Sequence, residues 1–119
     1  MPVRLSPADP TDVADALARL RDGDGHRTDL RMLTKHFLAL LVQKAPGGAV
    51  EVRVPPFAVA QCVPGTRHTR GTPPAVVEMD AATWIGLALG ELSWSTVVAD
   101  GRLRASGERS DLSELLPLT

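Results

Sequence analysis

The sequence predicts an α+β domain and argues against a doubly wound parallel sheet. Apolar residues recur at helical spacing through about the first 45 residues, and from Val50 onward they alternate with charged residues at every second position. The rest of the chain then carries two short capped helices, another alternating stretch and a final helix. Helices and strands therefore come in runs, which is typical of α+β folds.

Two helices are predicted before the first strand. Asp9 can cap the first helix, since Pro10 needs no hydrogen-bond acceptor in the first turn, and Gly23 supplies a stop. The second helix is expected to begin at about Asp29 and to end at Ala45-Pro46-Gly47-Gly48. Each helix has an apolar face, formed by Val13, Ala16, Leu17 and Leu20 in the first and by Leu30, Leu33, Phe37, Leu40 and Leu41 in the second.

Three strands follow the second helix. Alternation over Val50–Val54 indicates a half-buried strand of an antiparallel sheet with one solvated face. Pro55-Pro56 interrupts that strand, and a more apolar one is expected over Phe57–Val63. A polar loop over Pro64–Pro74 then leads to a short strand over Ala75–Met79.

Glycines punctuate the run that comes next. Asp80 is expected to cap a helix that continues through Leu89 and stops at Gly90. Ser93 is expected to cap a second short helix, which ends near Ala99. Both helices therefore carry their own start and stop signals.

The chain is expected to close with a strand and a helix. Residues Arg102–Ser106 alternate, with Leu103 and Ala105 facing one way. A short helix over Asp111–Leu116 follows, with Glu114 in its first turn.

Composition and net charge limit the classes of function that are expected for this chain. A chain of 119 residues with 44% apolar and 23% charged residues indicates one soluble domain, and a net charge of -1 gives no reason to expect nucleic acid as a partner. No apolar stretch approaches the roughly 20 residues that span a bilayer, so stable membrane insertion is not expected. The lone Cys62 and the absence of an apolar leader favour the cytoplasm. The sequence is compatible with a homo-oligomer as well as with a monomer.

The motifs of catalysis and metal binding are missing from the sequence. His26, His36 and His68 are too scattered for a metal set, and no GxSxG elbow or phosphate-binding glycine loop occurs. Cys62 lies in an apolar strand, where a thiol normally packs as a small hydrophobe. We therefore predict no catalytic residues, no metal and no cofactor.

Two features leave a choice between a binding role and a structural one. The loop Thr66–Thr72 contains Arg67 and Arg70, whose guanidinium groups can clamp a carboxylate or phosphate or can simply pair with nearby acids in a solvated loop. Trp84 and Trp94 can anchor their helices to the sheet or form the wall of a ligand cavity, and the two roles are compatible.

The stretch Leu87–Gly107 resembles the signature of the sterol carrier protein type-two family. An acidic residue opens a helix that ends in a glycine, a second short helix follows, and a glycine–basic–leucine strand ends at another glycine. Upstream, Val50–Cys62 and His68–Pro74 resemble the stand-alone bacterial branch of that family. The similarity covers about residues 28–116 of a single domain over 1–119, with 1–27 as an N-terminal helical extension.

The resemblance implies a twisted, mostly antiparallel sheet of about five strands covered by helices, with a fifth strand within Thr66–Arg70 or missing. It also implies an apolar tunnel for a sterol, fatty acid or acyl chain, and no catalytic machinery. The leading hypothesis is thus a non-enzymatic lipid-binding or carrier domain. The expected cavity walls are Phe37, Leu41, Phe57, Val59, Trp84, Leu87, Trp94, Val97 and Leu103, with Arg67 and Arg70 as head-group contacts.

Two alternatives accompany that hypothesis. The family also supplies accessory domains to enzymes, so the chain can be a protein-interaction or accessory module whose core is filled. The other alternative is an enzyme that uses the Arg67–Thr72 loop together with Cys62, and a buried, unreactive thiol would argue against it.

Overall fold

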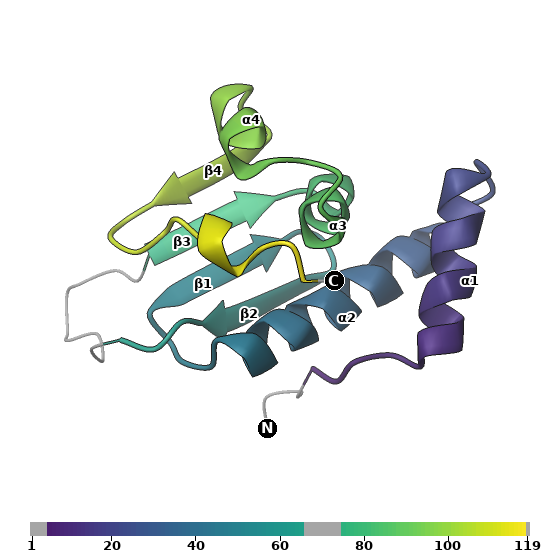
Figure 1. Cartoon of the computed structure of the whole chain (residues 1–119), viewed down its shortest axis with the longest axis horizontal. Helices are drawn as coiled ribbons and strands as arrows, with labels where there is room; N and C mark the ends of the chain where they lie inside the picture. The colour runs from purple at the N-terminus through teal and green to yellow at the C-terminus, as the bar shows by residue number, and fades with distance from the viewer. Residues whose placement is uncertain (1–4, 66–74, 119) are drawn as a thin grey trace.

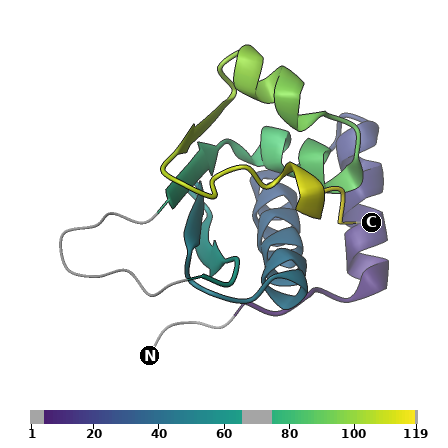
Figure 2. The same cartoon turned by 60° about the vertical axis from the view of Figure 1, so that its left-hand side comes forward.

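The structure is a computed structural model that describes residues 5–65 and 75–118. It is an α+β fold in three layers, which Figure 2 shows nearly edge-on. The sheet forms one layer, helices α2 (Arg27–Lys44) and α3 (Ala81–Leu89) form the second, and α1 (Pro10–Arg21) lies outside them. The predicted fold class is confirmed.

Four strands in the described residues form one mixed sheet in the order β2-β1-β3-β4 (Figure 1). The central strand β1 runs antiparallel to β2 and parallel to β3, and β3 runs antiparallel to β4. Two of the three pairings are therefore antiparallel, as predicted. The bounds are Val50–Val54 for β1, Ala58–Cys62 for β2, Ala75–Met79 for β3 and Leu103–Ser106 for β4.

Two predictions about the sheet need correction. The described sheet has four strands, not five, and the segment Thr66–Arg70 that was to hold a fifth lies outside the described residues. The pairing of β1 with β3 is parallel, although the alternation in β1 was interpreted as a sign of antiparallel neighbours. Alternation shows only that one face is covered, whereas the direction of a neighbour depends on where the chain returns to the sheet.

Helix α1 begins and ends as predicted, and α2 begins two residues earlier than predicted. Asp9 Oδ1 accepts a hydrogen bond from the N–H of Thr11 at 2.8 Å, which caps α1. Asp29 occupies the third position of α2, and its Oδ2 accepts from the N–H of His26 at 3.0 Å. This carboxylate reaches back across the first turn, so the helix includes the residues before it.

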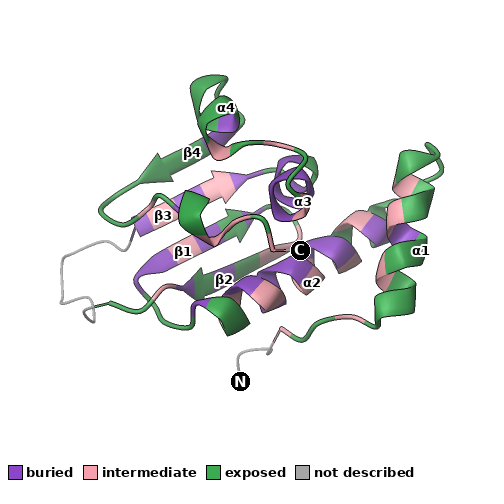
Figure 3. Ribbon diagram, in the orientation of Figure 1, coloured by how far each residue is buried: buried purple, intermediate pink, exposed green. Residues whose placement is uncertain are grey.

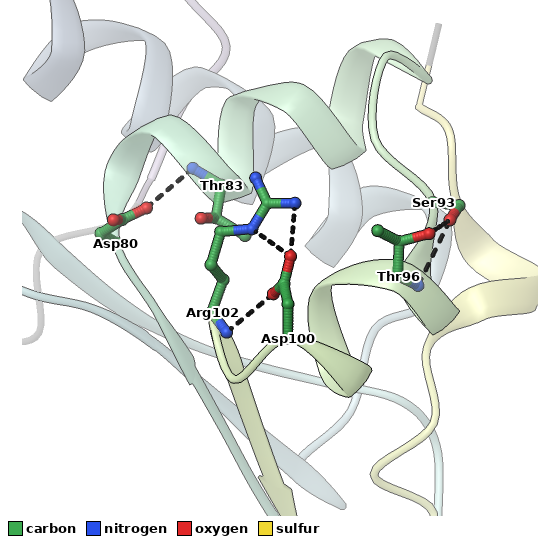
Figure 4. A network of polar contacts seen from close by, with 6 residues as sticks. All are labelled: Asp80, Thr83, Ser93, Thr96, Asp100 and Arg102. Atoms are coloured by element: carbon green, nitrogen blue, oxygen red, sulfur yellow. Dashed lines mark hydrogen bonds and ion pairs between the residues drawn. The ribbon is translucent and has the colours of Figure 1, made fainter.

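The caps predicted for α3 and α4 (Trp94–Ala99) are confirmed (Figure 4). Asp80 Oδ1 accepts from the N–H of Thr83 at 2.8 Å, and Ser93 Oγ accepts from the N–H of Thr96 at 3.3 Å. Gly90 ends α3 with a φ of 81°, in the left-handed region where glycine has no steric penalty. Both helices thus begin and end through local interactions.

The predicted final helix over Asp111–Leu116 is wrong. The chain forms only a 3₁₀ turn, η1, over Ser113–Leu115. Leu116 is extended, because the residue before a proline is disfavoured in the helical region. The segment then packs against α3, where the N–H of Leu118 donates to the carbonyl of Ala88 at 2.9 Å.

The core lies between the sheet and helices α2 and α3 (Figure 3). Inward-facing valines of β1 and β3 pack there against large side chains of α2 and α3. The opposite face is exposed at residues such as Arg53 and Arg104, which confirms the predicted solvated face. Within the described residues, none of the helices is both long and apolar enough to cross a bilayer.

Candidate functional site

Most of the predicted cavity walls form the packed core. Their side chains lie between the sheet and the helices and are at most 3% exposed. They contact one another within a single apolar cluster, so they occupy the space that the predicted cavity would need. These residues are Phe37, Leu41, Trp84, Leu87, Val97 and Leu103.

The other predicted site residues lie elsewhere. Phe57 is half-buried in the turn between β1 and β2, with the guanidinium of Arg27 5.1 Å from the centre of its ring. Trp94 is half-buried at the start of α4. Val59 is 55% exposed and shares a register position with Arg53 on the open face of the sheet, away from the helices. The head-group candidates Arg67 and Arg70 lie outside the described residues.

Trp84 joins α3 to α2 inside the core. Its Nε1–H donates to the backbone carbonyl of Thr34 at 3.2 Å, and the ring is fully buried. The Oγ1 of Thr34 is itself buried and has no hydrogen-bond partner in the described part of the chain. Trp84 thus anchors α3 to α2 through this bond, whereas the structural role predicted for it was an anchor to the sheet.

A hollow lies between α1, α2 and α3 instead. Its cavity volume is about 450 Å³, and most of its wall is made of leucine, isoleucine and alanine side chains. We call it the apolar groove. It is lined by Leu17, Leu20, Arg21, Leu30, Ala82, Ile85, Gly86, Leu89, Glu91 and Leu92, none of which was predicted as a site residue.

The groove exists because α1 is attached along α2 but stands off α3. Ala16 is the buried residue of α1, and Arg19 Nη2 lies 2.7 Å from Asp29 Oδ1 of α2. On the opposite wall, a side chain at Gly86 would place its Cβ 2.6 Å from Leu92 Cδ1. Glycine at this position therefore lets the Leu92 side chain pack directly against α3.

Two ion pairs lie close to the apolar groove, Arg19–Asp29 between α1 and α2 and Arg21–Glu91 at the rim. Arg19 and the N–H of His26 donate to Asp29, and these bonds lower the pKa of its carboxyl to about 2. Arg21 Nη2 lies 3.4 Å from Glu91 Oε1 at the rim, where the side chains are 65% and 57% exposed. A pair that is so exposed contributes little to stability, so Arg21 can exchange its partner at little cost.

Part of this site could have been found from the sequence. Helical spacing in the sequence predicts the apolar stripe of the first helix, which includes Leu17 and Leu20. The other wall includes Ile85 and Leu89 of α3, a helix that is apolar on nearly all sides, so its groove-facing side cannot be selected from periodicity. Leu92 follows in the turn after that helix.

The thiol of Cys62 is poorly placed to act as a nucleophile. Cys62 is buried, and burial raises the pKa of its thiol to about 11, so it carries almost no nucleophilic thiolate near neutral pH. Among residues 5–65 and 75–118, no three His, Cys, Asp or Glu side chains gather to hold a metal ion. The loop Arg67–Thr72 lies outside the described residues.

Comparison with known proteins identifies the family. A family model described as "Bacterial SCP ortholog" matches residues 26–118, which include every described element except α1. A search of curated proteins found no match. The match confirms the resemblance to the stand-alone bacterial branch of the sterol carrier proteins. The chain therefore belongs to the family of bacterial SCP orthologs.

Proposed function

We propose that this chain is a non-enzymatic carrier of one apolar molecule, an acyl chain or a sterol, and that the ligand lies in the apolar groove between α1, α2 and α3. The observation that carries the proposal is a hollow of about 450 Å³ with apolar walls in a chain of the bacterial SCP ortholog family. This volume is within the range of roughly 300–1,000 Å³ that is usual for small-molecule sites.

Half-buried leucines supply the driving force for binding. The side chains of Leu17, Leu20, Leu30, Leu89 and Leu92 are only partly covered, although each faces the same hollow. An apolar ligand that removes roughly 300 Å² from water gains about 7 kcal/mol, before association costs, at about 25 cal/mol/Å². That is sufficient for binding without extensive polar contacts.

The rim offers a place for an anionic head group. Arg21 pairs with Glu91 over 3.4 Å at the surface, and a guanidinium binds a carboxylate more strongly when two parallel hydrogen bonds form. A fatty acid carboxylate would therefore compete with Glu91 for Arg21. Arg21 is in this proposal a further head-group contact beside the predicted Arg67 and Arg70, which lie outside the described residues.

Trp84 distinguishes the groove from the cavity that was predicted between sheet and helices. It lies in the core and does not line the groove. Ligand in the groove should therefore change its fluorescence only weakly. A ligand that enters beside Phe37 and Leu87 must displace side chains around the indole and should shift the emission strongly.

The test is titration with a fluorescent fatty acid, accompanied by native mass spectrometry of gently purified protein. Replacing Leu20→Gln or Leu89→Gln in the groove should weaken binding about tenfold or more, because each change places an amide in an apolar wall. The matched control is Val98→Gln, which alters an exposed valine of α4 outside the groove. Equal affinity in all four proteins, or no lipid in the mass spectrum and no titration, would contradict the proposal.

A second candidate function is a protein-interaction or accessory module. The filled core favours it, since the large side chains that were expected to wall a cavity pack against one another instead. In that case the groove receives an apolar side chain of a partner protein and takes up no lipid. Analytical ultracentrifugation with a fluorescent fatty acid separates the two, because the ligand sediments with a lipid carrier but not with an interaction module.

A further inference from the structure

A second hollow, which we call the basic recess, lies between the segment before α1 and one side of α2. Its volume is about 380 Å³. None of its lining residues belongs to the apolar groove, so the two sites can be tested separately. The recess is lined by Ser6, Ala8, Thr28, Arg31, Met32, Lys35 and His36.

The recess carries an excess of positive charge. Arg31 and Lys35 line it, no Asp or Glu does, and the chain as a whole has a net charge of -1. Within the described residues, neither cation belongs to an ion pair. The two are four residues apart on one helix face, where like charges slightly destabilise the helix. The fold therefore gains nothing from placing them together.

The other polar side chains of the recess can each donate a hydrogen bond. The Nδ1 of His36 accepts from the N–H of Ala8 at 2.9 Å, so the neutral imidazole carries its proton on Nε2. Burial lowers the pKa of His36, which favours this neutral form near pH 7. The hydroxyl groups of Ser6 and Thr28 add two further donors to the wall.

We propose that the basic recess binds a phosphate group, either of a soluble phosphate monoester or of a phospholipid head group. Arg31 can bind two phosphate oxygens through its planar guanidinium, and Lys35 supplies a second positive charge one turn away. The hydroxyls of Ser6 and Thr28 complete the donor set. The site is distinct from the groove proposed for the apolar ligand.

The first experiment is an NMR titration of the full chain with inorganic phosphate, at an ionic strength held constant with chloride. Saturable shifts are expected at the backbone amides of Ala8, Lys35 and His36. Arg31→Gln and Lys35→Gln should each weaken the binding by about tenfold or more, because a charged hydrogen-bond partner is lost. The control Arg104→Gln removes the same charge from an exposed position on β4 and should leave the affinity unchanged.

The second experiment distinguishes the two sources of phosphate. The protein is sedimented with phosphatidylglycerol vesicles and, separately, with neutral phosphatidylcholine vesicles. Binding to the phosphatidylglycerol vesicles alone, lost in the double variant R31Q/K35Q, assigns the site to a lipid head group. Phosphate binding in solution without vesicle binding assigns it to a soluble phosphate compound.

Two results would overturn the proposal. One is the absence of both saturable shifts at the recess and vesicle binding that depends on Arg31 and Lys35. The other is an equal loss of binding in Arg31→Gln and Arg104→Gln, which would mean that only the overall charge matters. Neither result bears on the apolar groove, because fatty acid binding is measured with other variants and another ligand.

Discussion

Asp29 shows how one side chain can serve a helix and its neighbour together. Its Oδ2 accepts from the backbone N–H of His26, and both of its oxygens accept from Arg19 of α1. The same carboxylate therefore starts α2 and fixes α1 against it. Because all of these donors favour the ionised form, the pKa of Asp29 falls to about 2.

This pKa makes part of the stability dependent on pH. The folded carboxyl has a lower pKa than the ordinary 3.8, so its contribution is complete above about pH 4 and is lost as the pH falls towards 2. Asp29→Asn should lower the Tm near neutral pH, and the difference from the native chain should shrink towards pH 2. Thermal unfolding followed by circular dichroism measures this. The control Asp100→Asn breaks an exposed pair with Arg102 and should have a smaller effect.

The hydroxyl group of Thr34 lowers the free energy of unfolding of the native chain. Its buried Oγ1 lacks a partner in the described structure, and an unsatisfied buried hydroxyl costs about 1–3 kcal/mol. Thr34→Val removes the hydroxyl at nearly constant shape and should raise the free energy of unfolding by about 1 kcal/mol. Urea denaturation checks this. Thr34→Ser keeps the hydroxyl and loses a methyl group, so an increase in that variant would refute the explanation.

At the scale of elements, short helices are delimited by the residues just outside them. Asp80 and Ser93 begin α3 and α4, and Gly90 ends α3 in a left-handed conformation. These caps act within a few residues of the chain, which is why the bounds of α3 and α4 were predictable. The 3₁₀ turn at Ser113–Leu115 has no glycine to end it. Pro117 lies two residues after the turn and keeps Leu116 extended.

Gly90→Ala tests the end of α3. Alanine at a φ of 81° should cost about 1–2 kcal/mol, and its Cβ would also lie 3.3 Å from Pro117 Cβ. Gly101→Ala is the matched control, since its φ is 82° and nothing lies within 4 Å of the added atom. Chemical denaturation of both variants separates the energetic cost of backbone strain from the cost of the contact with Pro117. Unchanged stability in both would contradict the argument.

At the scale of the whole molecule, α1 lies outside the segment that the family model matches and contributes one buried residue, Ala16, to the core. The family match begins at residue 26, after α1, and the core lies between the sheet and α2 and α3. Yet Leu17, Leu20 and Arg21 of α1 form one wall of the apolar groove. The proposed binding site therefore depends on the element that lies outside the family match.

Hydrogen exchange should distinguish α1 from the elements that form the core. Only Ala16 of α1 is buried, so the amides of α1 should exchange much faster than those of α2 and β1, which open only with the core. Addition of fatty acid should slow exchange in α1 and leave β1 unchanged. Mass spectrometry of peptic fragments measures both effects. Equal protection of α1 and α2 without ligand would contradict the weak attachment of α1.

Several features were predictable because they depend on neighbours in the sequence. The alternation of Val50–Val54, the caps at Asp9, Asp80 and Ser93, and the buried character of Cys62 were identified correctly from local patterns. Val59 was placed in the cavity wall, although alternation along β2 directs it to the open face. That misplacement arose because the inward-facing side of a mostly apolar strand has no signal in sequence.

The sequence by itself determined the fold class, most element bounds and the family, because caps, turns and periodicity act over a few residues. Tertiary structure decided which apolar side chains pack together and where space is left over. Phe37 and Trp84 fill the place expected for a cavity, while α1 stands off α3 and leaves a groove between them. Apolar attraction has no direction, so an apolar stripe shows that a surface will be covered but not what will cover it.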